Sequence, residues 1–94
     1  MRSIAWKNTN LINICDPDLI GKTLIEGRLK IHISEDYFGG QLVGEPEALK
    51  MLRESSIVNL AGERSVTMAL SNKLGSAQAV RKIEGVPFLM IYKF

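Results

Sequence analysis

Residues 16–23 read DPDLIGKT, and this stretch decides whether the chain is built around a nucleotide-binding loop. A phosphate-binding loop needs the pattern GxxxxGK[ST], so that successive backbone N–H groups point at phosphate oxygens. Here Asp16 replaces the first glycine, and Pro17 removes one of the N–H donors. The carboxylates of Asp16 and Asp18 would also repel phosphate. We therefore predict a short helical turn over residues 18–23, capped by Asp16, in place of a P-loop.

On the N-terminal side of this stretch, the sequence predicts a β-hairpin. Residues 3–7 and 11–15 are two short apolar runs, and residues 8–10 separate them. Asparagines such as Asn8 and Asn10 tolerate the left-handed backbone conformation that tight turns use. Two apolar runs joined by so short a polar segment are typical of antiparallel strands.

On the C-terminal side, residues 29–34 form the clearest predicted strand. Apolar and polar residues alternate along it, so we expect Leu29, Ile31 and Ile33 to face the core. The opposite face then carries Arg28, Lys30, His32 and Ser34, of which the first three form a basic stripe.

Two helices are predicted in the second half of the chain. Pro46 suits a first helical position, and the acidic residues on either side of it lie near the positive end of the helix dipole. This helix ends near Ser55. Residues 63–74 have the apolar spacing of one helical face, and Gly75 can end the second helix.

Three further segments are predicted to be strands. Residues 41–44 fit a short edge strand. Residues 57–61 fit either a buried strand or the start of a helix, and we favour the strand. Residues 86–93 are apolar on both faces, which predicts a central strand with Pro87 at its start or at a bulge. This order indicates an α+β fold. We expect a single domain over residues 1–94, with a mixed or mostly antiparallel sheet of four to five strands and two main helices.

Composition narrows the function classes. The net charge of +2 and the pI of about 8.9 make the chain mildly basic, which permits contact with nucleic acid without demanding it. Cys15 and His32 are the only cysteine and histidine. No internal disulfide can form, and Cys and His alone cannot build a tetrahedral zinc site. With no apolar stretch long enough for a membrane span and no signal-peptide core, we expect a cytoplasmic protein.

The candidate site residues each have a structural alternative. His32 is the only obvious acid/base near neutral pH, but we favour a solvated strand histidine over a catalytic one. The basic stripe, joined by Lys22, could hold RNA phosphates, or it could simply be a polar sheet face in water. Tyr37 could stack on a base beside the glycines that follow it, whereas Phe38 fits a core position. Arg64, at the start of the second helix, could mark an anion site or a locally capped helix end.

Three blocks of sequence together resemble a known family. The first runs from Cys15 to Val43, the second is NLAGER at residues 59–64 with the helix behind it, and the third is GVP at residues 85–87. In this order and spacing the chain is similar to the small archaeal proteins grouped as domain of unknown function 424. The resemblance implies a free-standing archaeal cytoplasmic protein, with a role in RNA binding or translation. Members of this family tend to carry a histidine just after the GVP block, where this chain has Phe88, and this departure lowers the expectation of an enzyme.

We therefore expect a non-enzymatic, RNA-associated or translation-associated binding protein, with RNA or the ribosome as its partner. The expected phosphate contacts are Lys22, Arg28, Lys30, His32 and Arg64, with Tyr37 stacking on a base. A subunit that docks on another protein or on a second copy of itself is the alternative, and a small enzyme using His32 ranks last. We expect no catalytic residue set, no metal, no cofactor and no membrane partner.

Overall fold

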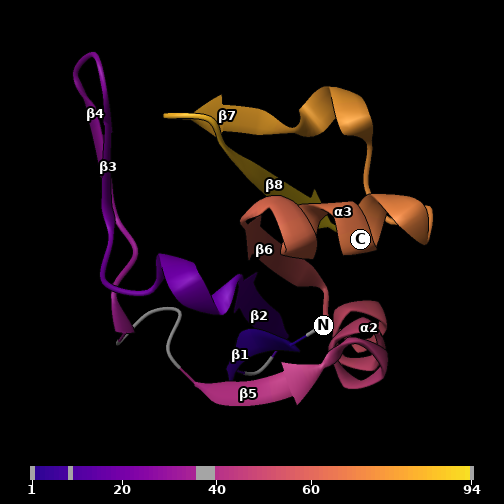
Figure 1. The fold of residues 1–94 in the computed structure, drawn as a ribbon. Coiled ribbons are helices and arrows are strands. Elements are labelled where there is room, and N and C mark those ends of the chain that lie inside the picture. Colours follow the sequence, from indigo (N-terminus) through magenta and orange to yellow (C-terminus); the bar gives the residue numbers. More distant parts are fainter. Residues whose placement is uncertain (1, 9, 36–39, 94) are drawn as a thin grey trace.

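The computed structural model describes residues 2–8, 10–35 and 40–93 (Figure 1). The strands are β1 (Arg2–Asn8), β2 (Leu11–Cys15), β3 (Thr23–Glu26), β4 (Leu29–His32), β5 (Gln41–Gly44), β6 (Ile57–Ala61), β7 (Arg81–Ile83) and β8 (Val86–Tyr92). Two α-helices lie within these ranges, α2 (Glu45–Glu54) and α3 (Glu63–Ser71), with the 3-10 turns η1 (Pro17–Leu19) and η2 (Ala77–Ala79).

Six strands form one mixed sheet in the order β5-β1-β2-β6-β8-β7, and β3 and β4 form a separate two-stranded sheet. Only the β2–β6 pair is parallel among these strands. Two parallel neighbouring strands need a long crossover connection. Between β2 and β6 this connection contains the β3–β4 hairpin, β5 and α2.

The two faces of the large sheet are covered differently. Alternate residues of the central strands, such as Val58 and Leu60 of β6, pack with α2 and α3 in one buried cluster. Their neighbours face the other way, where Ala61 and Cys15 pack with Leu24 of the β3–β4 hairpin in a second, smaller cluster. The helices thus cover one face, and the hairpin covers only part of the other (Figure 1).

The α+β class, the two main helices and the mixed sheet are confirmed, although the sheet has six strands where four to five were predicted. Residues 57–61 form a strand, and β8 lies inside the sheet between β6 and β7. Residues 41–44 form an edge strand, and residues 2–15 contain the predicted hairpin.

The short helical turn predicted after Asp16 is present, with Pro17 at its start, but its predicted range of residues 18–23 was wrong. The turn η1 covers only Pro17–Leu19, and β3 begins at Thr23. Gly21 and Lys22 already pair with Ile33: the Gly21 N–H donates to the Ile33 carbonyl at 2.7 Å, and the Ile33 N–H donates to the Lys22 carbonyl at 2.9 Å. Long-range pairing with the following strand therefore overrides the local helical signal.

The strand over residues 29–34 is also placed differently from the expectation. It ends at His32 and pairs with β3, outside the main sheet. Ile33 is buried, but Leu29 and Ile31 are only half-buried, because they face the main sheet across a gap.

The second helix ends earlier than predicted. Lys73 adopts φ 59°, and the Leu74 N–H returns to the Ala69 carbonyl at 2.9 Å. This pattern is a Schellman end, so the helix stops at Ser71, before Gly75 is reached.

Candidate binding face of the sheet

The face of the main sheet opposite the helices carries an unusual row of side chains. Register places Asn59 of β6 between Asn13 of β2 and Met90 of β8. Along β8, Phe88, Met90 and Tyr92 alternate on this same face because side chains two residues apart point the same way. Met90 is 50% exposed and Tyr92 57% exposed, which is high for large side chains on an inner strand.

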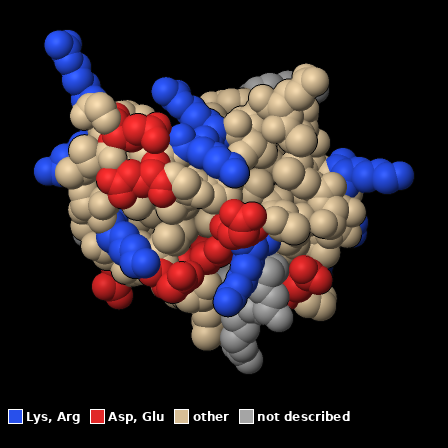
Figure 2. Space-filling view, turned by 45° about the horizontal axis from the view of Figure 1, so that its top comes forward, with Lys and Arg blue, Asp and Glu red and all other residues tan. Residues whose placement is uncertain are grey.

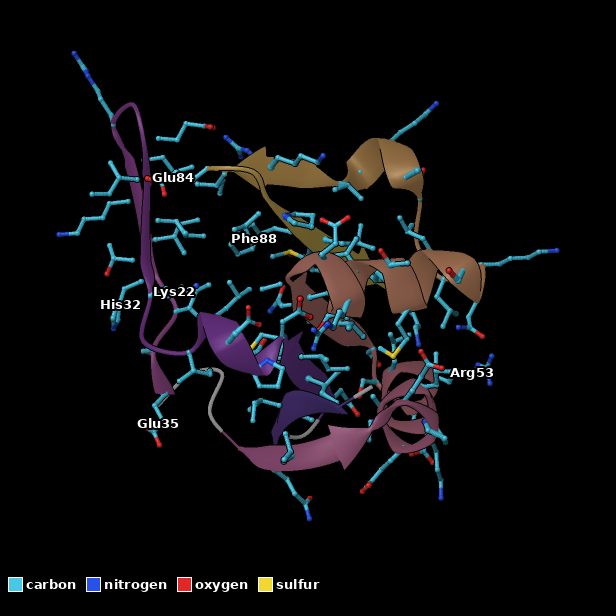
Figure 3. The ribbon with its side chains drawn as sticks, viewed as in Figure 1. Lys22, His32, Glu35, Arg53, Glu84 and Phe88 are labelled. Atoms are coloured by element: carbon cyan, nitrogen blue, oxygen red, sulfur yellow. The ribbon has the colours of Figure 1, made fainter. Side chains whose placement is uncertain are left out.

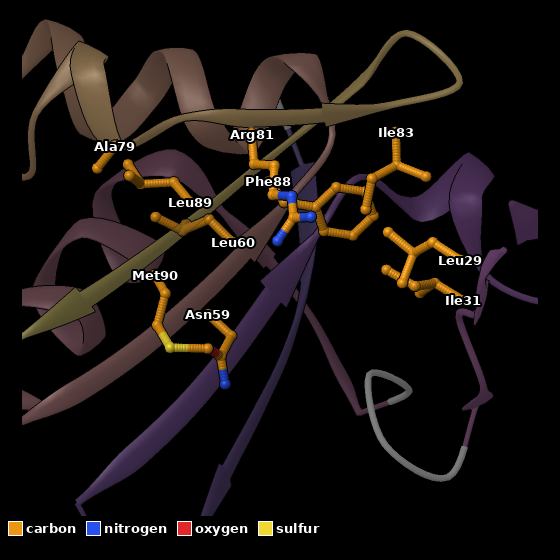
Figure 4. A pocket seen from close by; sticks show the side chains of 10 residues that line it. All are labelled: Leu29, Ile31, Asn59, Leu60, Ala79, Arg81, Ile83, Phe88, Leu89 and Met90. Carbon is orange, nitrogen blue, oxygen red and sulfur yellow. The ribbon is translucent and has the colours of Figure 1, made fainter. Parts of the chain in front are cut away.

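A trough of about 480 Å³ opens on this face, between the sheet and the hairpin (Figure 4). Leu29 and Ile31 of β4 form one wall, and Phe88 forms the opposite side. Asn59 and Arg81 supply polar groups to an otherwise apolar lining. Volumes of roughly 300–1,000 Å³ with a few polar groups among apolar walls are typical of small-ligand sites.

The Asn59 amide has one satisfied and one unsatisfied end. Its Nδ2 donates to Asn13 Oδ1 at 2.8 Å. Its Oδ1 is buried, and no described residue donates a hydrogen bond to it. Buried acceptors in proteins nearly always have a partner, so an orphaned one calls for an explanation. In Figure 4 the end of the Met90 side chain lies over this amide, as expected for directly opposite residues of β6 and β8.

Two carboxylates fasten the hairpin over the trough. Glu84, in the two-residue loop between β7 and β8, accepts a hydrogen bond from the Ile25 N–H at 2.9 Å. In return, the Glu84 N–H donates to the carboxylate of Glu26 at 3.3 Å. We call this reciprocal contact the Glu26–Glu84 clasp. It holds β3 beside the loop between β7 and β8.

The predicted cations do not converge on one surface. Lys30 and His32 lie on the face of the hairpin turned away from the trough, opposite Ile25 and Thr23 in the register, and Arg28 lies in the turn at the tip. Figure 3 shows His32 directed away from the body of the molecule and Lys22 directed toward it. Arg64 lies on the first turn of α3, outside the hairpin.

Charge on the visible surface is mixed. Figure 2 shows Lys and Arg side chains interspersed with Asp and Glu, without one continuous basic field. His32 Nδ1 lies 2.9 Å from Thr23 Oγ1, and both side chains are exposed. His32 therefore lies outside the trough. In the described ranges, no three His, Cys, Asp or Glu side chains gather as a metal site would require.

The comparison with family models decides the classification. Residues 6–94 match the model of the family described as "Protein of unknown function (DUF424)". The chain belongs to this family. A crystal structure of an uncharacterized conserved protein from the archaeon Methanopyrus kandleri has the same fold, with a TM-score of 0.78. It is 23% identical, and the alignment covers 98% of this chain and 91% of that one. No curated protein matches the chain.

The start of α3, predicted as an anion site or a locally capped helix end, is capped from a distance. Asp16 accepts hydrogen bonds from the Arg64 N–H at 3.0 Å and from the N–H and hydroxyl of Ser65, both at 2.8 Å. A buried carboxylate thus already occupies the positive end of the helix. Asp16 also occupies the N-cap position of η1, as predicted, but its side chain makes no hydrogen bond to that turn.

Cys15 is buried beside this carboxylate. Burial, reinforced by the charges of Asp16 and Asp18, raises the pKa of the Cys15 thiol to about 12. A thiol of this kind is protonated at neutral pH and unreactive.

Tyr37 and Phe38 lie outside the described residues. The sequence placed Asn59 with Arg64 in the possible anion site at the start of the second helix, whereas it lines the trough, and Arg81 and Met90 were missed as site candidates. The alternation of Phe88, Met90 and Tyr92 was the available signal, but an all-apolar strand gave no sign that one of its faces stays open. Among the described segments, no helix is both long and apolar enough to cross a membrane.

Proposed function

We propose that this protein is a small RNA-associated binding protein that holds single-stranded RNA on the open face of its sheet. The observation that carries the proposal is the row of Phe88, Met90 and Tyr92 on one inner strand, beside the Asn13–Asn59 amide pair. Phe88 and Tyr92 are four residues apart, about 13 Å along the strand. Proteins that bind single strands commonly stack successive bases on aromatic side chains of an exposed sheet.

The basic groups have a secondary role in this proposal. Arg28, Lys30 and His32 follow the outer side of the hairpin, and Arg81 lies in the trough. Arg81 would contact a phosphate beside the stacked bases, and the outward-facing cations of the hairpin would contact phosphates where the RNA strand continues beyond the sheet face. Lys22 and Arg64, which lie away from this group, would add weaker long-range attraction. The mixed surface charge favours modest affinity over strong non-specific binding.

Fluorescence anisotropy with labelled single-stranded RNA, measured across a salt series, tests the proposal. Affinity should rise as salt falls because phosphate contacts release counterions. Tyr92→Ala should weaken binding about fivefold or more, the loss expected for one stacked base. Leu42→Ala is the matched control, since Leu42 is 46% exposed on the edge strand β5, away from β8. Absence of binding at low salt, or equal effects of the two variants, would refute the proposal.

A protein-interaction subunit is the second candidate. It is favoured by the large apolar side chains of Ile25, Leu42, Met90 and Tyr92, each about half exposed among the described residues. Light scattering over a concentration series tests self-association. A mass above one chain that falls to the monomer value in Met90→Asp would favour this candidate over RNA binding.

A further inference from the structure

The geometry points to a specific ligand for the trough: we infer that it binds one nucleotide, with the base between the hairpin and β8 and the phosphate at Arg81. This inference rests on the proposed function, since it assigns one base of the bound strand to a defined pocket. Unlike RNA binding in general, it also predicts that an isolated mononucleotide enters the trough.

The shape and lining of the trough suit a flat apolar group. Leu29 and Ile31 project from the hairpin on one side, and the Phe88 ring lies on the other (Figure 4). Aliphatic and aromatic side chains on opposite sides can contact both faces of a heterocycle at once. All three are only half-buried, so the surface they present is open to a ligand.

The floor supplies a hydrogen-bond acceptor that lacks a donor. Asn59 Oδ1 is buried and has no donor among the residues that the structure describes. Met90, which covers it, is half exposed and flexible, so a ligand can displace its side chain. The exocyclic amino or ring N–H group at a base edge is the donor that this oxygen needs. The bond from Asn59 Nδ2 to Asn13 keeps the amide in a fixed orientation for this contact.

The charge in the lining selects an anionic ligand. Arg81 pairs directly with Phe88 across β7 and β8, so its side chain lies on the same face and beside the ring. A guanidinium binds phosphate through paired N–H groups. Flat apolar faces, an N–H donor at the edge and a phosphate are combined in a nucleotide. A lipid lacks the edge donor, and a tryptophan side chain of a peptide lacks the anion.

NMR titration of the labelled protein with each ribonucleoside monophosphate tests this inference. We expect shifts at the Asn59 side-chain amide and at the methyl groups of Met90 and Ile31, with little change at the outward-facing His32. Affinity should be about millimolar for so small a ligand with few polar contacts. Arg81→Gln should weaken the monophosphate about tenfold and leave the nucleoside without phosphate unchanged.

Lys82→Gln is the matched control. It removes the same charge from the adjacent position of β7, whose side chain points to the other face, and should change nothing. Asn59→Leu should weaken the monophosphate and the nucleoside alike by about tenfold. Because this change also removes the hydrogen bond from Asn59 Nδ2 to Asn13, the Arg81→Gln result tests the inference if Asn59→Leu fails to fold.

The outcomes separate the two proposals. Mononucleotides that leave the trough signals unmoved overturn the nucleotide site, while Tyr92-dependent RNA binding would leave the proposed function standing. If neither mononucleotides nor RNA binds, both proposals fall. If an N-acetylated tryptophan amide shifts the trough signals and nucleotides do not, the trough is a peptide site and the nucleotide assignment is wrong.

Discussion

Two junctions in this molecule use the same chemistry in opposite surroundings. At each, a carboxylate from one segment accepts a hydrogen bond from a backbone N–H far away in sequence. Asp16 does so for α3 and is only 6% exposed, whereas Glu84 does so for the β3–β4 hairpin at the surface. Removing a buried acceptor leaves its donors without water or protein, while water replaces an exposed one.

The contrast predicts two levels of stability. The Asp16 junction ties α3 to the end of β2 and belongs to the main folding unit. The hairpin joins this unit through the smaller cluster around Leu24 and Ile33 and through the Glu26–Glu84 clasp, whose hydrogen bonds water can replace. We expect the wall of the trough to open more readily than the sheet beneath it, as is common for elements that border binding sites.

The largest effect is expected from Gly62→Ala, which attacks the buried junction through the backbone. Gly62 has φ 107° and ψ 157°, a region that is essentially confined to glycine. A Cβ there would lie 2.8 Å from the Asp16 Cβ and closer still to its carboxyl group. We expect a loss of about 3 kcal/mol or more in the free energy of unfolding, measured by urea denaturation.

A control for this variant is Gly21→Ala. Gly21 also has positive φ, but nothing lies within 4 Å of a Cβ built there. This variant should lose only about 1 kcal/mol in the free energy of unfolding, from the strain of a side chain at positive φ. Equal losses in the two variants would show that the contact with Asp16 contributes little.

The next effect is expected from Asp16→Ala. This variant removes the hydrogen-bond acceptor for the N–H groups of Arg64 and Ser65 and for the Ser65 hydroxyl, at a buried helix end. We expect a loss of about 2–3 kcal/mol by urea denaturation. Asp18→Ala, two residues along and exposed, should change the stability by less than about 0.5 kcal/mol. A small loss for Asp16→Ala would mean that other groups or water take over the cap.

The buried thiol of Cys15, next to Asp16, should make the stability depend on pH. The pKa of Cys15 is about 12 in the folded chain and near 9.0 when unfolded. Since the folded pKa is the higher one, the stabilisation is complete below pH 9 and is lost as the pH rises toward 12. Relative to Cys15→Ala, the wild type should lose up to about 1.4 kcal/mol per pH unit above pH 9. Parallel stability curves for the two proteins would mean that the thiol reaches solvent.

Local patterns predicted most of the main sheet and both helices. Alternation and apolar runs predicted β1, β2, β6 and β8. These strands lie inside the sheet, and buried positions there require apolar residues at a spacing that the sequence shows. Pro46 located the first helix to within one residue of its start at Glu45. These segments were predictable because their signals are local: an apolar run, an alternating pattern or a residue at the helix start.

The junctions and the site could not be predicted in the same way. Asp16 was read as the cap of the nearest turn, yet its partners lie on α3, nearly fifty residues away. Thr23 to Glu26 became a strand only because Leu29 to His32 folds back on it. The trough arises where the hairpin stands off from β8, and no local pattern encodes that spacing. Residues such as Arg81 and Met90 therefore gave no sign of a site in the sequence.

The smallest effect is expected from Glu84→Ala, and it tests the other side of the contrast. The variant removes the acceptor for the Ile25 N–H, which lies on an exposed strand edge, so the global stability should fall by less than about 1 kcal/mol. Hydrogen exchange at Ile25 should nevertheless accelerate about tenfold, with no change at Ser65, because only the hairpin loosens. Glu84→Gln keeps a neutral acceptor, so its hydrogen-exchange rate at Ile25 should lie between those of the wild type and Glu84→Ala. If Glu84→Ala lowers the stability as much as Asp16→Ala, the hairpin is part of the main folding unit, and the trough has a wall as rigid as its floor.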